Sequence, residues 1–394
     1  MSVRIARLDN LCEINPRMPR TLSDDDAASF LPMAAVSENG SIDFEEQRAV
    51  REVKKGYTYF ERGDVLVAKI TPCFENGKAA RTDKLTNPFG FGSTEFHVLR
   101  AGKEVDSSYL FHLIWNSKFR EIGANNMTGS AGQKRVPVDF LRRLEIPLPP
   151  LPEQRRIAAI LDKADALRRK RKHTIELLDS LMQSIFLEMF VEGHDPAWPV
   201  CTVDELATDI RTGPFGSQLL HSEFVDEGIA VLGIDNAVSN EFQWSARRYI
   251  TPEKYKRLLR YTVKPHDVII TIMGTCGRCA VVPEDIPLAI NTKHLCCITL
   301  DARRCLPEFL HAAFLRHPSV LEQLGVQAKG AVMPGLNMGI IKSLQIPMPP
   351  VAKQQGFAEV VQSLREQGGL QSLALDTNEA LFSSLQHRAF SGQL

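Results

Sequence analysis

Apolar residues repeat with a helical period between residues 153 and 190. The stripe contains Ile157, Ile160, Ala164 and Leu167, is interrupted at Arg171 and Thr174, and resumes with Leu178, Leu181 and Ile185. No glycine or proline occurs between these limits. One continuous helix of about 57 Å is therefore predicted, at about 1.5 Å per residue. A helix of that length exceeds the core of a small domain and suits a spacer between domains.

Residues 353–390 carry a second, weaker stripe that contains Phe357, Leu364, Leu381 and Leu385. Gly368 and Gly369 fall inside it, and each glycine costs up to about 1 kcal/mol in a helix interior. A kink or break is therefore predicted at this glycine pair. Two similar long helices most simply pair antiparallel along their stripes.

Both helices follow a proline-rich phrase, "IPLPPLPEQ" at 146–154 and "IPMPPVAKQ" at 346–354. Proline lacks an amide hydrogen and disfavours the α region at the preceding residue. The stretch "PLPP" at 147–150 is therefore predicted to be extended, and the first helix is predicted to begin only after Pro152. The match continues without a gap at an offset of 200 positions as far as Phe190 and Phe390.

Segments before the phrase repeat more loosely. Residues 107–126 and 307–326 each show the period of one amphipathic helix, and "GDVLVAKITPC" and "HDVIITIMGTC" each predict a β-branched strand that enters a turn. The chain is therefore predicted to be a tandem duplication of one mixed α/β (α+β) unit. The predicted boundaries are 1–145 and 193–345 for two similar domains, and 146–192 and 346–394 for the connectors with their long helices.

Composition restricts this interpretation only in part. The 394 residues, 44% of them hydrophobic, suit two globular domains. The sequence has no apolar run of membrane-spanning length, and its first residues lack the apolar core of a signal peptide. A cytoplasmic protein with reduced thiols is therefore expected. The formal net charge is zero, so a nucleic-acid-binding protein of this composition must concentrate its basic residues locally.

One local concentration of charge lies at 153–173, where eight Lys and Arg residues accompany three Asp and Glu residues. Its densest part consists of Arg168, Arg169, Lys170, Arg171 and Lys172. These side chains are candidates for neutralising the phosphates of spacer DNA. A docking surface for an acidic partner protein and a solvated helix face are the alternatives.

Polar turns beyond the repeated strands are the other candidates for DNA contact. Gly274 and Gly277 allow a close backbone approach, and Arg278 can donate two hydrogen bonds to guanine or hold a phosphate. The candidates in the first half are Lys69, Thr71, Asn76, Lys78, Ser130, Gln133, Lys134 and Arg135. Those in the second half are Arg211, Thr212, Ser217, Gln218, Thr275, Arg278 and Lys329. Each is alternatively an ordinary polar turn residue, and phosphate contacts are expected to outnumber base contacts.

Sequence signals for catalysis or metal binding are weak. The pair Cys276 and Cys279 lacks a second pair at the spacing of a structural zinc site. Cys296 and Cys297 are adjacent in a predicted strand and so face opposite ways. Buried, reduced cysteines are expected. "TNPFGFGST", which begins at Thr86, matches the amino-methyltransferase motif only in part, and the sequence has no phosphate-binding loop of GxxxxGK[ST] form. No catalytic residue, metal or bound cofactor is predicted.

The two proline connectors with their helices resemble the DNA-specificity subunits of type I restriction–modification systems. The segments 212–237 and 330–350 strengthen this resemblance, which extends over essentially the whole chain. It implies a non-catalytic subunit in which each domain recognises one half of a bipartite site on double-stranded DNA. It also implies that the helices set the half-site spacing and dock two methyltransferase subunits. Those partners carry S-adenosylmethionine, and motor-nuclease subunits join them for restriction.

Two other functions stay open. A two-headed scaffold that binds proteins would expose an apolar groove on each domain instead of a basic surface. A divergent methyltransferase would itself bind S-adenosylmethionine.

Overall fold

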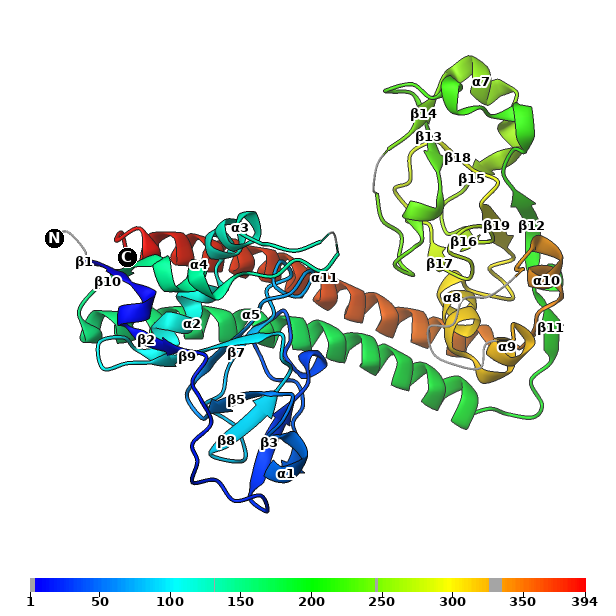
Figure 1. Ribbon diagram of the computed structural model, residues 1–394. Coiled ribbons are helices and arrows are strands. Elements are labelled where there is room, and N and C mark those ends of the chain that lie inside the picture. Colours follow the sequence, from blue (N-terminus) through cyan, green and yellow to red (C-terminus); the bar gives the residue numbers. More distant parts are fainter. Residues whose placement is uncertain (1–3, 131, 245–246, 326–334) are drawn as a thin grey trace. The chain divides into compact units, whose positions relative to one another are not determined.

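The computed structural model describes residues 4–130, 132–244, 247–325 and 335–394 of the chain. Contacts divide the chain into two units (Figure 1). Unit 1 comprises Met1–Lys172 together with Leu373–Leu394, and unit 2 comprises His173–Ser372. The chain therefore leaves unit 1 along one long helix and returns to it along another.

Unit 1 contains two four-stranded sheets, with strand orders β2-β9-β6-β7 and β4-β3-β8-β5, and a two-stranded sheet β1-β10. The strands are β1 Arg4–Arg7, β2 Cys12–Ile14, β3 Ala27–Leu31, β4 Glu46–Ala49, β5 Thr58–Glu61, β6 Val65–Ala68, β7 Ala79–Arg81, β8 Phe89–Gly92, β9 Phe96–Ala101 and β10 Glu145–Leu148. The helices are α1 Val50–Val53, α2 Ser107–Trp115, α3 Ser117–Asn125, α4 Val138–Arg143 and α5 Leu151–Leu187. Strands β3 and β8 run parallel, and the other pairs run antiparallel.

Unit 2 repeats this arrangement, with sheets β12-β19-β16-β17, β14-β13-β18-β15 and β11-β20. The strands are β11 Val200–Thr202, β12 Ala207–Thr212, β13 Ile229–Leu232, β14 Tyr249–Ile250, β15 Thr262–Val263, β16 Val268–Thr271, β17 Cys279–Val281, β18 Ala289–Asn291, β19 Leu295–Leu300 and β20 Gln345–Pro347. The helices are α6 Val203–Leu206, α7 Pro252–Lys256, α8 Pro307–Arg316, α9 Pro318–Gln323, α10 Met338–Ser343 and α11 Val351–Phe390. Helices α5 and α11 each pass from one unit to the other, after Lys172 and after Ser372. The identical strand orders confirm the predicted duplication and the mixed α/β fold.

The repeated strands β6 and β16 are buried on both faces, which explains their continuous apolar sequences. In β6, Val65 and Val67 belong to the core beneath the helices, whereas Leu66 belongs to the core against the second sheet. In β19, Cys296 and Cys297 lie in two different cores, as predicted for neighbours on a strand. Each unit therefore packs helices, a first sheet and a second sheet as successive layers.

The start of each phrase is extended, as predicted, because Pro147 lies in β10 and Pro347 in β20. Residues 151–154 and 351–354 instead belong to α5 and α11. The predicted start of the first helix was wrong, since α5 begins at Leu151 and includes Pro152. Proline fits the first turn of a helix because amide groups there have no partner within the helix. The amides of Glu153 and Gln154 both donate to the Pro150 carbonyl, at 2.8 and 3.0 Å.

A buried glutamine follows each phrase and ties its helix to the domain. The side chain of Gln154 donates to the carbonyls of Glu104 and Pro149 and accepts from the amide of Asp106, at 2.9, 2.8 and 2.8 Å. Gln354 makes the same three contacts, with Arg304, Pro349 and Leu306, at 3.0, 2.9 and 2.8 Å. Both glutamines are fully buried. All their partners are main-chain atoms, so these contacts do not depend on neighbouring side chains.

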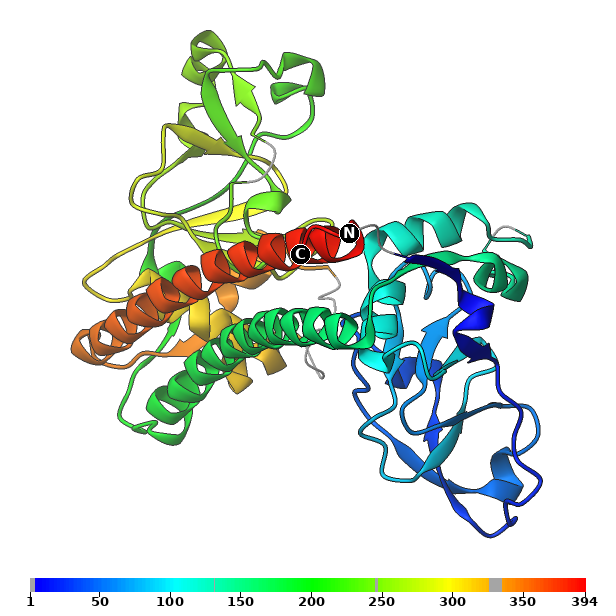
Figure 2. The same ribbon diagram turned by 90° about the vertical axis from the view of Figure 1, so that its left-hand side faces the viewer.

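Helix α11 is continuous from Val351 to Phe390, so the predicted break at Gly368 and Gly369 was wrong. Apart from the adjacent residues and the helix's own backbone, no atom lies within 4 Å of the position that a Cβ would take at either glycine. The low helix propensity of the two glycines is outweighed by the helical segments before and after them, because elongation of an existing helix is favourable. Within each unit, the segments of α5 and α11 lie side by side (Figures 1 and 2).

The helix pairing is antiparallel within both units, as predicted. In unit 1, Ile157 of α5 shares a core with Ala389 of α11, and further along α5 Arg168 lies over the ring of Phe382. In unit 2, the rings of Phe186 and Phe357 are 5.6 Å apart. The predicted stripe was partly out of phase, because Leu167 and Leu181 are 42% and 47% exposed while Leu161 is fully buried.

The helical segment predicted at 107–126 is two helices, α2 and α3, and α8 and α9 divide 307–323 in the same way. Asn116 ends α2 in an extended conformation, and its side chain accepts from the Phe119 amide at 2.8 Å. Pro318 occupies the first turn of α9. An asparagine cap and a proline each start a new helix. Within the described parts of the chain, no helix is long and apolar enough to cross a membrane.

Candidate nucleic-acid interface

The first candidate surface in unit 1 is the turn at residues 69–78, which follows β6. The turn is closed by main-chain hydrogen bonds from Phe74 to Ile70 and from Asn76 to Pro72, at 3.0 and 2.9 Å. Gly77 has a φ of +85°, a conformation that favours glycine. The sequence therefore turns sharply here and presents polar side chains immediately beyond a rigid buried strand.

A second predicted set, at residues 128–135, lies against this turn although it is some 60 positions away in the sequence. The Thr71 amide donates to the Lys134 carbonyl at 3.0 Å, and the Val136 amide donates to the Lys69 carbonyl at 2.9 Å. Thr128 and Arg135 form a further antiparallel bridge. The structure thus brings the candidates at 69–78 and those at 130–135 together into one surface.

Several candidates on this surface already have partners within the chain. Arg135 binds Glu95 with two nitrogens, and the contact of Nη2 is 2.8 Å. That hydrogen bond holds the pKa of Glu95 below its usual value. The Asn76 side-chain amide donates to Glu38 at 2.8 Å, and Lys78 Nζ donates to the Met33 carbonyl at 3.3 Å.

Other candidates of this surface are more open. Ser130, Gln133 and Lys134 are exposed, while Lys69 and Thr71 are half-buried. Thr71 Oγ1 donates to Glu75 at 3.1 Å. Lys134 and Gln133 are therefore the side chains of this surface that are best placed to meet a ligand.

Two buried residues that sequence reasoning missed support the surface from beneath. His97 contacts the Val136 carbonyl through Nε2 at 2.8 Å and the Asn15 side chain through Nδ1 at 3.3 Å. Burial lowers the pKa of His97, which favours the neutral ring. Trp115 donates from Nε1 to the Gly77 carbonyl at 3.1 Å. The sequence placed both residues on repeated segments, a strand and a helix. It did not show that they contact the two loops of this surface.

The equivalent turn in unit 2, residues 272–278, is closed around Thr271. Thr271 Oγ1 accepts from the Arg278 amide at 2.9 Å, and the Gly277 amide donates to the Thr271 carbonyl at 2.9 Å. Gly274 and Gly277 have φ values of +71° and +81°. Thr275 is exposed and Arg278 is half-buried. The two predicted side chains lie on this turn.

Two other loops of unit 2, at Ile234 and His294, contact this turn, and the loop at Gly213 contacts the second of them. A Cβ at Gly274 would lie 2.9 Å from Ile234, and one at Gly213 would lie 2.2 Å from the Asn291 carbonyl. The Ile272 amide donates to the His294 carbonyl at 2.9 Å. Glycine is thus needed at 213 and 274 because loops from different strands approach closely there.

The candidates at 211–218 differ in their surroundings. Thr212 is half-buried at the end of β12, and Ser217 is exposed. Gln218 is exposed, and its side-chain oxygen accepts from the Tyr261 hydroxyl at 2.9 Å. Lys329 lies outside the described residues.

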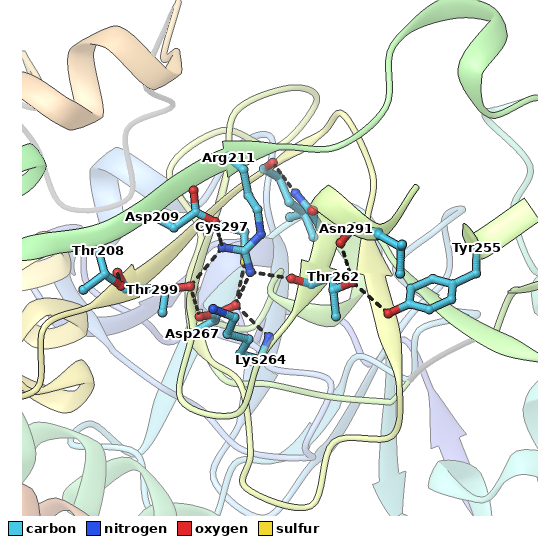
Figure 3. A network of polar contacts seen from close by, with 12 residues as sticks. Thr208, Asp209, Arg211, Tyr255, Thr262, Lys264, Asp267, Asn291, Cys297 and Thr299 are labelled. Atoms are coloured by element: carbon cyan, nitrogen blue, oxygen red, sulfur yellow. Dashed lines mark hydrogen bonds and ion pairs between the residues drawn. The ribbon is translucent and has the colours of Figure 1, made fainter. Parts of the chain in front are cut away.

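Arg211 requires a correction, because it belongs to the interior of unit 2. Its side chain is 8% exposed and contacts Asp209 and Asp267, both within ion-pair distance. It also donates to Thr299 Oγ1 at 2.9 Å and to the Thr262 carbonyl at 2.6 Å. Figure 3 shows these partners converging on the guanidinium. A buried charge held in this way stabilises the fold and is not available to DNA.

The basic cluster 168–172 lies on α5 and is partly neutralised. Arg168 and Arg169 both bind Asp165, at 2.8 and 2.7 Å. Lys170 and Arg171 also have interaction partners. Lys172 is exposed. The charge available to a polyanion is therefore smaller than the sequence indicates.

Cysteine positions fit packing better than metal binding. All eight cysteines are free, and within the described ranges no three His, Cys, Asp or Glu side chains form a metal-sized group. Burial raises the pKa of the Cys296 and Cys305 thiols to about 12. Thiols of this kind are poor nucleophiles and poor metal ligands.

The chain matches the type I restriction modification DNA specificity domain over residues 3–177 and 235–371. The type I restriction enzyme EcoAI specificity subunit of Escherichia coli is 40% identical over 186 residues, which are 45% of this chain and 31% of that protein. The MjaVIII specificity subunit of Methanocaldococcus jannaschii is 23% identical over 290 residues, which cover 69% of this chain and 66% of that one. The chain thus spans about a third of the first relative's length.

Two solved structures share the fold over 99% of this chain. The type I restriction–modification S subunit from M. genitalium has a TM-score of 0.60 at 15% identity, with 96% of that chain covered. A chain from a structural study of complex assembly and conformational transition in the type I R-M system has a TM-score of 0.58 at 20% identity, with 98% covered. The matched domain, together with the duplicated sheets and long helices, shows that this chain belongs to the type I restriction–modification DNA specificity family.

Proposed function

We propose that this chain is the DNA-recognition subunit of a type I restriction–modification complex and has no catalytic activity of its own. Each unit recognises one half of a bipartite double-stranded DNA site through its turns, 69–78 with 128–135 in unit 1 and 272–278 with its neighbouring loops in unit 2. The observation that carries this proposal is the presence, at equivalent places in two identical sheet arrangements, of turns with different sequences.

The sequence differences between the turns support different half-sites. The turns of unit 1 present Lys69, Thr71 and Lys134, whereas the turn of unit 2 presents Thr275 and Arg278. A duplicated frame with two different contact surfaces matches a DNA site with two different halves, as dimer symmetry matches a palindrome. The contacts at these turns would include more phosphates than base edges.

Long helices and partner subunits complete the proposal. Helices α5 and α11 set the distance between half-sites and dock two methyltransferase subunits, which carry S-adenosylmethionine and modify the DNA. Motor-nuclease subunits join that complex for restriction, and the complex acts in the cytoplasm, where the chromosome is accessible. Leu177, Leu370 and Leu373 are 53–66% exposed on the helices, which supports a protein partner there.

The test is a genome-wide map of modified adenines in cells with and without this gene, in the presence of its methyltransferase. A bipartite motif with a fixed unspecified gap, modified only when the gene is present, is expected. If an otherwise functional methyltransferase gave an unchanged map, the proposal would fail and the two-headed protein scaffold would become the better account.

The spacer role has its own test. Four residues inserted after Lys172, with four matched residues after Ser372, lengthen each helix by about 6 Å, close to two base pairs of DNA. The preferred gap between half-sites should increase accordingly, while both half-site sequences stay the same. An unchanged gap would refute the spacer role without affecting half-site recognition.

A further inference from the structure

Helix α5 continues into a π-helical turn, Glu188–Glu192. Turns of this kind are rare in proteins and occur frequently at functional sites. The turn buries Phe190 and leaves Val191 half-buried. Both residues line a pocket of about 430 Å³ in unit 2, within the range of about 300–1,000 Å³ that is typical of ligand sites.

The wall of this pocket is largely apolar. Besides Phe190 and Val191, Pro318 of α9 and Pro347 of β20 line it. Pro347 pairs with Val200 of β11, and residues directly opposite one another in a sheet lie on the same face. Val200 is 59% exposed, so it adds open apolar surface beside Pro347. An apolar surface of this kind is suited to burying a side chain of a partner.

One nearly buried imidazole in the wall has an unpaired nitrogen. His317 is 8% exposed, and its Nδ1 contacts Ser319 Oγ at 2.9 Å. Its Nε2 has no hydrogen-bond partner among the residues that the structure describes. Burial lowers the pKa of His317, and the nearby His194 lowers it further, which favours the neutral ring. The His317 ring therefore does not oppose a cation at this place.

Acidic residues lie on the segments that form the pocket. The acidic rim consists of four exposed side chains, Glu188, Glu192, Asp195 and Glu322. None of the four forms an ion pair with any part of the chain that the structure describes. Between His173 and Ile210 the sequence contains eight Asp and Glu residues and no Lys or Arg. Negative charge is therefore concentrated beside the apolar wall.

Lys353 of α11 contacts the same segment but is directed to other groups. Its Nζ donates to the Gly193 carbonyl at 3.3 Å and lies 4.8 Å from the centroid of the Trp198 ring. Within the described ranges, this Nζ forms no ion pair with a carboxylate. The acidic rim therefore remains available to a cation from outside the chain.

The matching place in unit 1 keeps the aromatic ring, as Phe390, and reverses most of the charge. The charged residues at the matching positions are Arg388, Lys118 and Glu121, with Gly392 in place of Glu192. A basic ligand is therefore favoured at unit 2 alone, which gives one ligand per chain. A partner that binds in two copies, as the two methyltransferase subunits would, needs a surface that both units present.

We propose that this pocket binds one further protein per chain, through a segment in which an apolar side chain is flanked by lysine or arginine. The apolar side chain is buried against Phe190, Val191 and Pro318, and the flanking cations pair with Glu192 and Glu322. Apolar burial supplies most of the affinity, and the exposed ion pairs select a basic segment over an acidic one. The inference goes beyond the proposed DNA-recognition function and does not depend on it.

The test selects binders of the full chain from a library of random linear peptides displayed on phage. The wild type should enrich peptides that carry an aromatic or aliphatic residue between lysines or arginines. Glu192→Lys with Glu322→Lys should weaken the binding of these peptides by about tenfold, because two exposed attractions become repulsions. Val191→Ser, which introduces the residue type of position 391, should weaken it by about fivefold through the loss of apolar contact.

Glu227→Lys with Glu284→Lys is the matched control, because both glutamates are exposed in unit 2 and the charge change is the same. It should leave peptide binding unchanged. The inference would be overturned by a selection without the basic-flanked apolar motif, or by equal peptide affinity for the wild type and the charge-reversed variant. Loss of peptide binding on addition of the methyltransferase would also overturn it, since the pocket would then belong to that interface. The map of modified adenines should be the same for the charge-reversed variant and the wild type, so failure of this inference is distinguishable from failure of the proposed function.

Discussion

In both units a buried aspartate precedes the central strand, β6 or β16, and binds an arginine. The arginine belongs to a different strand in each unit. Asp64 precedes β6, accepts from the Glu61 amide at 2.7 Å and binds Arg100 of β9 with both oxygens at 2.9 Å. Asp267 precedes β16 and accepts from the Lys264 amide at 2.8 Å. Its arginine is Arg211, which belongs to β12.

Strand register explains this difference. Val65 pairs with Leu99 and Val268 pairs with Ile298, so Arg100 and Thr299 occupy equivalent positions. The threonine hydroxyl still donates to Asp267, at 2.6 Å, but carries no charge. Arg211 supplies the charge from the neighbouring strand. Both units therefore place an arginine at the buried aspartate, but from different positions in the repeat.

The largest effect is expected from Asp267→Asn. Arg211 is 8% exposed, and removal of its main counter-charge should destabilise unit 2 by about 3–5 kcal/mol. Asp64→Asn should destabilise unit 1 less, because Arg100 is 26% exposed and Arg211 only 8%, while each arginine keeps a second carboxylate, Glu61 or Asp209. Amide hydrogen exchange measured separately in β16 and β6 checks this order. Equal losses would show that exposure of the arginine does not matter.

The next largest effect is a pH dependence of the stability of unit 2, caused by His311. His311 Nε2 contacts the carbonyls of Asn240 and Cys279, at 2.8 and 3.0 Å. Burial lowers its pKa to about 4 from an ordinary value of 6.5. Since the folded pKa is the lower one, its contribution is complete above pH 6.5 and is lost as pH falls toward 4. The loss should approach about 3 kcal/mol.

The control for this pH effect is His311→Gln, which removes the titrating group. Exchange of α8 and β17 amides in the variant should depend less on pH over this range than in the wild type. The equivalent position of unit 1 is Phe111, which does not titrate. An identical pH dependence in the variant would assign the effect to other groups.

Equal effects are expected from the two buried glutamines. Gln154→Met and Gln354→Met each leave one amide and two carbonyls unpaired, so each should cost about 1–3 kcal/mol in its own unit. Denaturant unfolding followed by hydrogen exchange in α2 and α8 measures the two losses. A large difference between them would mean that the two contacts, although geometrically alike, do not have the same role.

The smallest effect distinguishes the long helices. Gly368→Ala and Gly369→Ala should each stabilise α11 by about 0.5–1 kcal/mol, because the added Cβ meets no atom within 4 Å. Thermal unfolding measures the gain. Helix α5 has no glycine at which the same change can be made. A loss of stability would indicate that the glycine pair has a function that α5 lacks.

Local chemistry made much of the fold predictable from the sequence. The apolar runs of β6 and β16, the proline phrases and the long helices depend on neighbouring residues, and the structure contains all of them. The helical segments at 107–126 and 307–323 are each divided in two. The predicted break at Gly368 was wrong because elongation of an existing helix outweighs the low helix propensity of glycine. The predicted helix start after Pro152 was wrong because proline is accommodated in the first turn of a helix.

Side-chain roles were less predictable, because partners distant in the sequence decide them. Arg211 resembles a DNA contact until Asp267, 56 positions away, is known to bind it. One signal was available: Asp64 and Asp267 both precede the repeated strand, and a repeated buried aspartate needs a cation.

The pairing of β1 with β10 makes the recognition fold of unit 1 an exchangeable cassette. Arg4–Arg7 lie in register with Leu148–Glu145, so the first and last segments of the cassette are adjacent. Two crossovers in these strands would replace every turn between them in one genetic event. The seam would persist, because strand pairing and the Gln154 contacts use main-chain atoms that any incoming sequence supplies. If the chain recognises DNA as proposed, such an exchange would change the recognition turns of unit 1 and keep its architecture.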